Sequence, residues 1–570
     1  MRTRLHHAIQ AAIIRRCELK PEEFPTFTVE VPHLDNHGDF ATNAALALAR
    51  LVRKQPRQIA QWLREDLSGL DFVERVEIAG PGFVNVFIRP EAWRGVVAEI
   101  VGAGTDFGRS QAEKPESVIV EFVSANPTGP LHVGHGRGAV IGDVLASLIA
   151  VTGHRVYREF YVNDAGNQVQ NLAQSVLYHL RTKRGLSSTF PEEGYRGAYV
   201  ADLADQVPAQ LTAFLPNEIS SAELGAIQEF CVQRMLAVIV DDLASFGVRM
   251  DRYSSERDLV QRGRLQETFA ELEKRKTIQM SEGACWFLAE KYGDEKPRVL
   301  VKSDGSNTYF ATDVAYHLDK LRRGFDRLIN IWGADHHGYI PRLKAALAAL
   351  GHPPEKLEVL LVQMVSLLRA GQPVVLSKRA GEIISMREVV EEVGQDAARF
   401  FFLMRSSDSQ MEFDLELAKK RSLDNPVFYV QYGHARLSSI LAKATERGIP
   451  VPTLEGLRAI DLSPLASADE LQMIKKMADF PDMLRRANEN RAPHLVVFYI
   501  QDLVATFHRY YTTGSRTNPI LGGDPKQIAA RLVFVLALRQ VIRNALTVLG
   551  VSAPDRMDTL AVADAQQVPE

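Results

Sequence analysis

Two histidines three residues apart, His132 and His135, stand in the glycine-rich segment LHVGHGRG. An apolar run that predicts a strand precedes this segment, and a run that predicts a helix follows it. Gly134, Gly136 and Gly138 remove side chains where the helix begins, so a phosphate chain could approach the backbone N–H groups there. Imidazole N–H donors would stabilise negative charge on a phosphate under attack. The spacing therefore predicts a nucleotide site.

A basic segment much further along the chain, VLSKRAG at 375–381, is a second candidate for phosphate binding. Lys378, with Ser377 beside it, would bring a positive charge to the phosphates from a loop. An exposed basic turn would be the better explanation if this segment stood alone. Because the histidine segment is also present, the phosphate-binding interpretation is favoured.

Several acidic and polar residues are expected at strand ends near these two segments. Glu121 precedes the histidine segment on its strand, and Asp335 follows a later strand. Asp313 is expected to begin a helix after the strand-like NTYFAT, with Tyr309 four residues before it. Carboxylates around one crevice would suit a guanidinium group. Asp313 and Asp335 could instead cap helices, which is the commoner role for aspartate at such positions.

Residues 115–410 alternate predicted strands and helices, which is typical of a parallel α/β sheet that could position these side chains. The expected strands are 117–123, 155–162, 298–303, 327–333 and 357–365, with helices at 135–151 and 313–323 between strands. The long helical stretch at 165–275 is too large for a simple crossover. We interpret this stretch as an insertion in the sheet domain.

The flanking regions predict two further domains. Residues 1–108 predict a small α+β domain, with a helix at 41–52 and a hairpin at 73–88. Residues 412–570 contain no convincing strand and predict an all-α helical bundle. The expected helices of this bundle are 426–447, 467–488, 491–511 and 525–549.

Composition excludes several classes of protein. The 570 residues carry a formal charge of −3, whereas a generic DNA-coating protein would be strongly basic. No apolar run suggests a membrane span, and the N-terminus lacks the features of a signal peptide, so a cytoplasmic location is expected. Cys17, Cys231 and Cys285 are far apart, which makes a cysteine zinc site and a disulfide framework unlikely interpretations.

The segment from His132 to His135 resembles the HIGH signature of class I aminoacyl-tRNA synthetases. This resemblance implies a Rossmann-like catalytic domain that binds ATP with Mg²⁺ and no protein-bound metal. Ser377 and Lys378 match the last two positions of the family's KMSK loop, while Val375 stands where the first lysine belongs. The implied catalytic residues are His132, His135 and Lys378. The implied ATP-binding residues are His132, Gly134, His135, Gly136, Ser377 and Lys378.

Five segments in order resemble arginyl-tRNA synthetases, at 120–135, 161–168, 308–320, 332–347 and 549–557. The resemblance implies that arginine is bound by Glu121, Asn126, Tyr309, Asp313 and Asp335. It also implies an N-terminal domain that touches the tRNA elbow, a C-terminal anticodon-binding domain, and a monomer. The implied reaction is the ATP-dependent joining of L-arginine to tRNA(Arg), with an activation step that waits for tRNA.

Aromatic and cationic residues alternate where the helical domain begins. Tyr429, Tyr432 and Arg436 could stack on and contact splayed anticodon bases, and His434 stands among them. Core packing is the alternative role for the tyrosines. Three other functions remain open at this point: a class I synthetase for another amino acid, a small-metabolite adenylyltransferase, and a non-catalytic RNA-binding paralogue.

Overall fold

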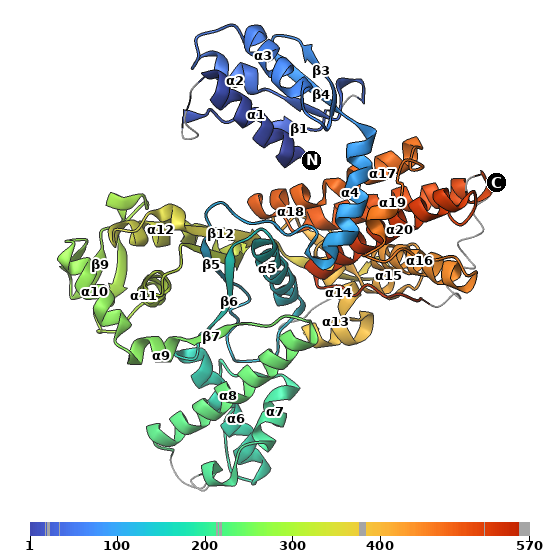
Figure 1. The fold of residues 1–570 in the computed structure, drawn as a ribbon. Helices are drawn as coiled ribbons and strands as arrows, with labels where there is room; N and C mark the ends of the chain where they lie inside the picture. The colour runs from blue at the N-terminus through green and yellow to red at the C-terminus, as the bar shows by residue number, and fades with distance from the viewer. Residues whose placement is uncertain are drawn as a thin grey trace.

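The structure is a computed structural model, and it describes residues 1–570 except 18, 20–22, 33–34, 213–214, 216–218, 375–383, 518 and 558–570. Figure 1 shows a small N-terminal domain that stands apart, a central sheet with its helices, and a helical bundle along one flank of the sheet. A separate helical lobe extends from the opposite end of the molecule.

A five-stranded parallel sheet lies at the centre, in the order β12-β11-β5-β6-β7. Its strands are β5 (Ser117–Glu121), β6 (Arg155–Val162), β7 (Arg252–Ser255), β11 (Arg327–Gly333) and β12 (Leu357–Val362). Helix α5 (Val133–Val151) follows β5, and α11 (Tyr309–Arg322) precedes β11. All the strands run the same way, so their carboxyl ends meet at one edge, as the α/β pattern predicted.

Two expected strands of this sheet are placed differently in the structure. Strand β10 (Arg298–Val301) pairs antiparallel with β9 (Ala284–Phe287), and β9 pairs with β8 (Ile278–Ser281), in a separate small sheet. Short apolar runs do not reveal which sheet they join, so the expectation for 298–303 was wrong. The run at 357–365 divides after Val362, because the amide of Gln363 donates to the carbonyl of Ser407 and takes the chain out of the sheet.

A third sheet starts after that break. Its strands are β13 (Val365–Arg369), β14 (Gln372–Pro373) and β15 (Met411–Asp414). Strand β15 lies at the start of the region that we expected to contain no strand. It pairs parallel with β13, which joins the end of the catalytic region to the helices that follow.

The stretch at 165–275 is not helical throughout. Helices α6 (Asn167–Lys183), α7 (Ala198–Asp205) and α8 (Ser221–Ser245) pack around their own apolar core and form the lobe in Figure 1. The chain then returns to the central sheet as β7, whose sequence RYSS is too short and polar to predict a strand. Helices α9 (Glu256–Gln261) and α10 (Arg264–Lys274) follow β7.

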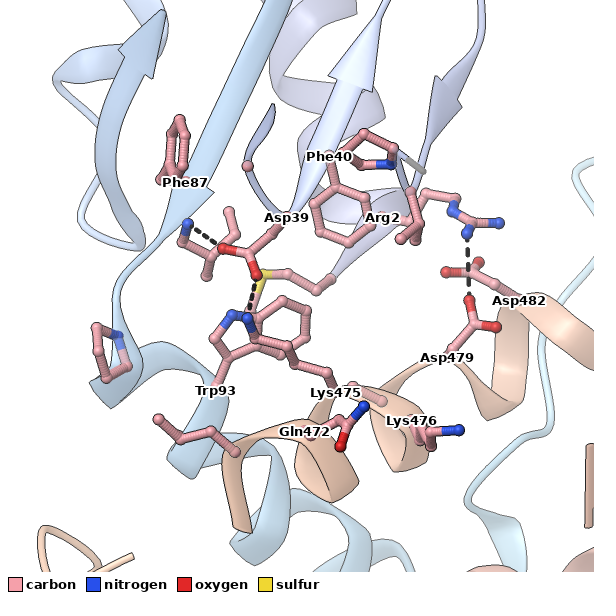
Figure 2. Close-up of a pocket in the computed structure, with 18 of the residues that line it drawn as sticks. Arg2, Asp39, Phe40, Phe87, Trp93, Gln472, Lys475, Lys476, Asp479 and Asp482 are labelled. Atoms are coloured by element: carbon pink, nitrogen blue, oxygen red, sulfur yellow. Dashed lines mark hydrogen bonds and ion pairs between the residues drawn. The ribbon is translucent and has the colours of Figure 1, made fainter. Parts of the chain in front are cut away.

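The N-terminal domain is built on an antiparallel sheet in the order β1-β2-β4-β3. Its strands are β1 (Val29–Glu30), β2 (Phe40–Thr42), β3 (Val73–Ala79) and β4 (Phe83–Ile88), with helices α1 (Arg2–Cys17), α2 (Ala44–Ala49) and α3 (Pro56–Ser68). The predicted hairpin at 73–88 is therefore confirmed. Figure 2 shows where this domain meets the bundle around a cavity of about 720 Å³. There Asp39 pairs with Lys475, and Arg2 pairs with Asp479.

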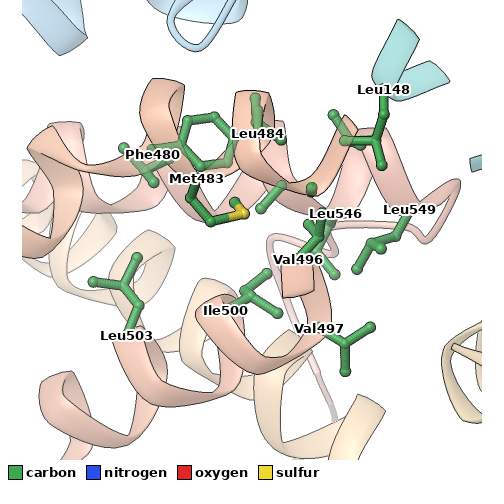
Figure 3. Packing of buried hydrophobic residues seen from close by; sticks show 14 of the residues in the cluster. Leu148, Phe480, Met483, Leu484, Val496, Val497, Ile500, Leu503, Leu546 and Leu549 are labelled. Carbon is green, nitrogen blue, oxygen red and sulfur yellow. The ribbon is translucent and has the colours of Figure 1, made fainter. Parts of the chain in front are cut away.

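The C-terminal region is the predicted bundle. Its long helices are α16 (Pro426–Glu446), α17 (Ala468–Ala478), α18 (Phe480–Glu489), α19 (His494–Thr517) and α20 (Pro525–Leu549). Helix α4 (Pro90–Ala103), which leaves the N-terminal domain, packs against α17 and α20. In Figure 3, Leu148 of α5 approaches the apolar side chains of the bundle, which therefore shares its core with the catalytic region.

One described helix, α20, is long and apolar enough to cross a membrane by length and composition. In the folded protein, 72% of its apolar window is buried, so its hydrophobicity is used in the core of the bundle.

A buried arginine connects the catalytic region to the bundle. Arg399, on α14 (Gln395–Phe402), has no exposed surface. Its guanidinium donates to Asp143 Oδ2 at 2.6 Å and to the carbonyl oxygens of Phe246 and Leu549, each at 3.0 Å. These three partners come from α5, the end of α8 and the end of α20. One side chain thus satisfies buried acceptors from three elements that are far apart in sequence.

We expect Arg399→Met to lower the free energy of unfolding by about 3–5 kcal/mol, because two buried carbonyls lose their donor and Asp143 keeps only Arg158 as a cationic partner. The thermal midpoint, measured by circular dichroism, should fall well below that of the wild type. Arg458→Met, at an exposed position on the same half of the molecule, is the matched control. Equal midpoints for the two variants would contradict this role of Arg399.

Candidate active site

The two histidines of LHVGHGRG cap helix α5 reciprocally. His132 is the N-cap, and its Nδ1 accepts a hydrogen bond from the backbone N–H of Gly134 at 3.1 Å. The backbone N–H of His132 donates in turn to Nδ1 of His135 at 3.2 Å. The two imidazole rings stack with their centroids 3.8 Å apart. This arrangement resembles a capping box in which imidazole nitrogens replace the usual oxygens.

This geometry determines which ring nitrogens can donate. A nitrogen that accepts a hydrogen bond carries no proton, so both neutral rings hold their proton on Nε2. His132 and His135 therefore present two Nε2–H donors beside the first turn of α5. The positive end of the α5 dipole lies at this turn and adds to the positive potential. Two such donors beside the start of a helix are suited to an anion with oxygen acceptors.

The three glycines of the histidine segment have different surroundings. A Cβ on Gly134 would lie 2.9 Å from the ring of His132, so this glycine makes room for the cap. A Cβ on Gly136 would lie 3.3 Å from Phe402 and 3.4 Å from Met386, so this glycine allows close helix packing. Only Gly138 faces open space. The structure thus gives Gly136 a packing role, and its expected approach to a phosphate stays a prediction.

Ser377 and Lys378 lie outside the described residues, and so does Val375. The two ends of this segment are described. Val374 donates from its backbone to the carbonyl of Leu367 at 2.9 Å. At the other end Ser385 forms an antiparallel bridge with His132, and the amide of Met386 donates to the carbonyl of Leu131 at 2.7 Å. Ser385 and Met386 thus lie directly beside the histidine cap.

A cavity of about 360 Å³ opens at the carboxyl ends of β5, β6 and β11. Four residues that we predicted to bind arginine line it together, namely Glu121, Asn126, Tyr309 and Asp313. Asp335 does not line it: this side chain is 78% exposed on a short 3-10 helix (Ala334–Tyr339), beside His336. The sheet therefore brings most of the predicted set to one place, as expected for strand ends at one edge.

The helix that carries Asp313 begins earlier than we expected. Thr308 is the N-cap of α11, and its side chain accepts from the amide of Ala311 at 3.3 Å. The interpretation of NTYFAT as a strand was therefore wrong, because the threonine caps a helix that already contains Tyr309. Asp313 lies in the second turn and does not serve as the cap. Its carboxylate instead accepts from Tyr339 Oη at 2.6 Å.

Glu256 is a cavity residue that sequence reasoning missed. It is the first residue of α9, directly after the short strand β7, and only 7% of it is exposed. Tyr161 Oη donates to its carboxylate at 2.9 Å. The only sequence signal was the Ser-Ser-Glu run that ends RYSSE, within the stretch that we interpreted as helical.

The cavity holds more negative charge than its own cations compensate. Glu121 pairs with the buried Lys320. No lysine or arginine of the described residues pairs with Asp313 or Glu256. Burial raises the pKa of Asp313 to about 7, with further contributions from the charges of Glu121 and Glu256. Burial likewise raises the pKa of Glu256 to about 7. Such a pair of carboxylates favours a cationic ligand.

The turn between β5 and the histidine cap has an unusual backbone. Val123 and Ser124 have φ values of 70° and 42°, in the left-handed region that non-glycine residues seldom occupy. Side-chain contacts hold this turn: Ser124 Oγ donates to Glu121 at 3.0 Å and accepts from the amide of Tyr161 at 3.1 Å. Asn126, just beyond, donates to Gln168 at 2.6 Å. The chain thus keeps this conformation between the cavity and the cap.

The predicted RNA-binding residues of the bundle form one cluster. The guanidinium of Arg436 lies over the rings of Tyr432 and Tyr511, 4.6 and 4.8 Å from their centroids. Tyr429 packs edge-on against His508, with centroids 4.8 Å apart. His434 does not belong to this surface, because it is fully buried and its ring bonds the carbonyl of Pro554.

The fold and this site define a class I aminoacyl-tRNA synthetase. Residues 97–189 and 220–413 match the catalytic domain of class I tRNA synthetases of the arginine type. Residues 3–88 match the arginyl-tRNA synthetase N-terminal domain, and residues 430–557 match the DALR anticodon-binding domain.

Relatives and solved structures agree with these matches. An arginine–tRNA ligase of Syntrophotalea carbinolica is 47% identical over 98% of this chain and 99% of its own. An arginyl-tRNA synthetase of Thermus thermophilus is 26% identical, covering 98% of this chain and 100% of its own, with a TM-score of 0.75. A putative one from Campylobacter jejuni is 36% identical, covering 82% and 100%, with a TM-score of 0.74. The chain belongs to the arginyl-tRNA synthetase family, and its catalytic and anticodon-binding domains are those of an arginine–tRNA ligase.

Substitution of His132 should separate its structural and chemical roles. Asparagine is a good N-cap residue, so we expect His132→Asn to keep the stability of the wild type. His132→Ala should lose about 1 kcal/mol of stability with the cap. Thermal unfolding of the two variants checks this difference. Equal destabilisation by both substitutions would mean that the cap is not what His132 contributes to folding.

Proposed function

We propose that this chain activates L-arginine with ATP, forming arginyl-adenylate and pyrophosphate, and then transfers arginine to the 3′-terminal ribose of tRNA(Arg). The observation that carries this proposal is the pair of cavity carboxylates, Asp313 and Glu256, that lack a cationic partner among the described side chains. A guanidinium can donate to two carboxylates at once through its fixed N–H groups. A neutral amino-acid side chain would leave both acids uncompensated.

The positions of the residues suggest how arginine is oriented. Its carboxylate has to reach the α-phosphate of ATP, which we place at the Nε2–H donors of His132 and His135. Asn126 lies at one end of the cavity, on the loop that leads into the histidine cap. This end of the cavity would therefore take the α-amino and carboxylate groups of arginine. The guanidinium then extends to Asp313 and Glu256, with Glu121 on the cavity floor between the strands.

The chemistry is an in-line substitution at phosphorus. An oxygen of the arginine carboxylate forms a bond to the α-phosphate, and the bond from this phosphorus to the pyrophosphate oxygen breaks. His132 and His135 donate to the phosphate oxygens as their charge grows, and the first turn of α5 adds its positive potential. Lys378, with Ser377, would hold the leaving pyrophosphate. Mg²⁺ would accompany ATP and be held mainly by its phosphates.

The other domains would bind tRNA. We assign residues 1–108 to the tRNA elbow, 115–410 to catalysis and 412–570 to the anticodon. Tyr429, Tyr432 and Arg436 offer rings and a guanidinium on which anticodon bases can stack. The terminal ribose of tRNA, through its 2′-hydroxyl, would attack the carbonyl of the adenylate and release AMP. We expect the enzyme to act as a cytoplasmic monomer.

Arginine-dependent exchange between ATP and labelled pyrophosphate tests this function directly. Exchange with arginine plus tRNA(Arg), and not with other amino acids, is the expected result. Exchange with arginine alone would keep the activity but remove the requirement for tRNA in the first step. Exchange only with another amino acid, or none at all, would replace the proposal with a sister synthetase or a non-catalytic paralogue.

The cavity acids predict how arginine binding depends on pH. Asp313 and Glu256 have pKa values raised to about 7, so they are protonated below that pH and cannot pair with a cation. We therefore expect kcat/KM for arginine to be full above pH 8 and to fall as the pH drops through 7, while the KM for ATP changes little.

Asp313→Asn and Glu256→Gln should each raise the KM for arginine by about tenfold or more, because a charged hydrogen bond is lost. Steady-state kinetics with each substrate varied in turn measure the effect. Asp335→Asn is the control on the same face of the sheet, at a residue that does not line the cavity. Equal changes in the KM for arginine and for ATP would argue against this role for the two acids.

A further inference from the structure

A buried lysine lies behind the wall of the arginine cavity. Lys320, on the inner face of α11, has no exposed surface and does not line the cavity itself. Its Nζ donates to Glu121 Oε2 and, at 3.1 Å, to Asn330 Oδ1. It also lies 4.4 Å from the centroid of the Tyr316 ring. The buried ammonium therefore has two hydrogen-bond acceptors and an aromatic ring around it. Without such partners, burial of a lysine would be costly.

One hydrogen-bond chain leads from Lys320 to Asp313. Asn330 accepts from Lys320 with its oxygen, so its Nδ2 donates to His317 Nε2 at 2.7 Å. His317 Nδ1 then carries the proton and donates to the carbonyl of Asp313 at 2.8 Å. Burial holds the pKa of His317 well below its usual range, so the ring stays neutral and this direction is maintained. The chain fixes the helical turn that presents the Asp313 carboxylate.

A second chain leads from Lys320 to the strained turn. Glu121 accepts from Lys320 with one carboxylate oxygen and from Ser124 Oγ with the other. Ser124 in turn accepts from the amide of Tyr161. The same ammonium therefore orients Glu121 and, through it, the left-handed turn that precedes the histidine cap. Both ends of the cavity are linked to one side chain.

We infer that Lys320 is the positioning residue and built-in counter-ion of the arginine cavity, and that this role determines how strongly the cavity prefers a cation. The inference rests on the proposed function. Lys320 compensates Glu121 and leaves Asp313 and Glu256 for the guanidinium of the substrate. Without Lys320, the three acids would face one another with no internal cation, and each would hold its proton more strongly.

The charged and titratable groups around this site can be named from every element that packs there. Asp313 faces Glu121 of β5, Glu256 of α9, Tyr161 of β6 and Tyr339 of the 3-10 helix, together with Lys320 of its own helix. The first two raise the pKa of Asp313 through their charges, whereas Lys320 lowers it. The acid limb of the pH profile is the range in which kcat/KM for arginine falls as the pH is lowered. Removal of Lys320 should therefore move this acid limb toward higher pH.

The test is Lys320→Met, which keeps the length of the side chain and removes the charge. We expect the KM for arginine to rise by about tenfold or more, and the KM for ATP to change by less than about twofold. The midpoint of the acid limb of kcat/KM for arginine should move up by about one pH unit. Lys320→Gln, which keeps a donor but no charge, answers the same question if the methionine variant does not fold.

Arg323→Met is the matched control. Arg323 lies one turn further along α11 and pairs with the buried Glu159 at 2.6 Å, so its loss also breaks a buried ion pair to the central sheet. Neither Arg323 nor Glu159 lines the cavity. This variant should lose stability, measured by its thermal midpoint, while the ratio of the two KM values and the acid limb stay those of the wild type.

A double variant separates charge from packing. Lys320→Met with Glu121→Gln restores the net charge of the wild-type cavity, so its acid limb should return most of the way to the wild-type pH. An acid limb shifted equally in the single and double variants would overturn the counter-ion role. So would a wild-type acid limb and KM ratio in Lys320→Met. If the wild type itself shows no arginine-dependent exchange, the proposed function fails, whatever these variants do.

Discussion

Uncompensated negative charge at the carboxyl edge of the central sheet is the constraint around which the catalytic domain is organised. Most other buried charges of the described chain have a partner: Glu159 pairs with Arg323, and Arg399 pairs with Asp143. Asp313 and Glu256 do not, and an isolated buried carboxylate is costly unless it protonates or finds a cation. The cavity is therefore suited to a cationic group, and in the proposed function this group is the guanidinium of arginine.

At the start of α5, two histidine side chains serve as helix caps. His132 and His135 satisfy two backbone N–H groups of the helix start with their Nδ1 atoms, and this requirement leaves Nε2–H as the donor on each ring. In the proposed function, these Nε2–H groups would donate to a phosphate. Gly134 and Gly136 contribute by letting the imidazole of His132 fold back and letting α5 pack closely on Phe402. Local helix chemistry and function depend on the same atoms.

The helical bundle and the catalytic sheet are one packed body in this structure. Arg399 joins α5, α8 and α20, and the apolar side chains of α18 to α20 share a core with Leu148. Apolar residues of the N-terminal domain belong to the same cluster, and this domain also meets the bundle through ion pairs around a large cavity (Figure 2).

Much of this protein follows from its sequence. The parallel sheet, the N-terminal hairpin and the bundle were predictable, because periodicity and turn residues are local properties. Glu121 was predicted from its place at a strand end. Tyr309 and Asp313 were predicted beside a strand that is in fact part of a helix, and Asn126 followed only from the family resemblance. Other features were decided only by the tertiary structure. The strand β7 is too short and polar to predict, so Glu256 stayed hidden inside an apparently helical stretch.

The sequence also did not predict which charges around the cavity are paired. In the sequence, Lys320 is an ordinary residue of a predicted helix. The fold buries it completely against Glu121, 199 positions away. Asp335 has a sequence position as suggestive as that of Asp313, but its side chain points to solvent. A sequence determines which residues are available at the ends of strands. Only the packing of strands and helices determines which carboxylates are buried, which are paired, and which remain for the substrate, because burial and ion pairing are properties of three-dimensional neighbours.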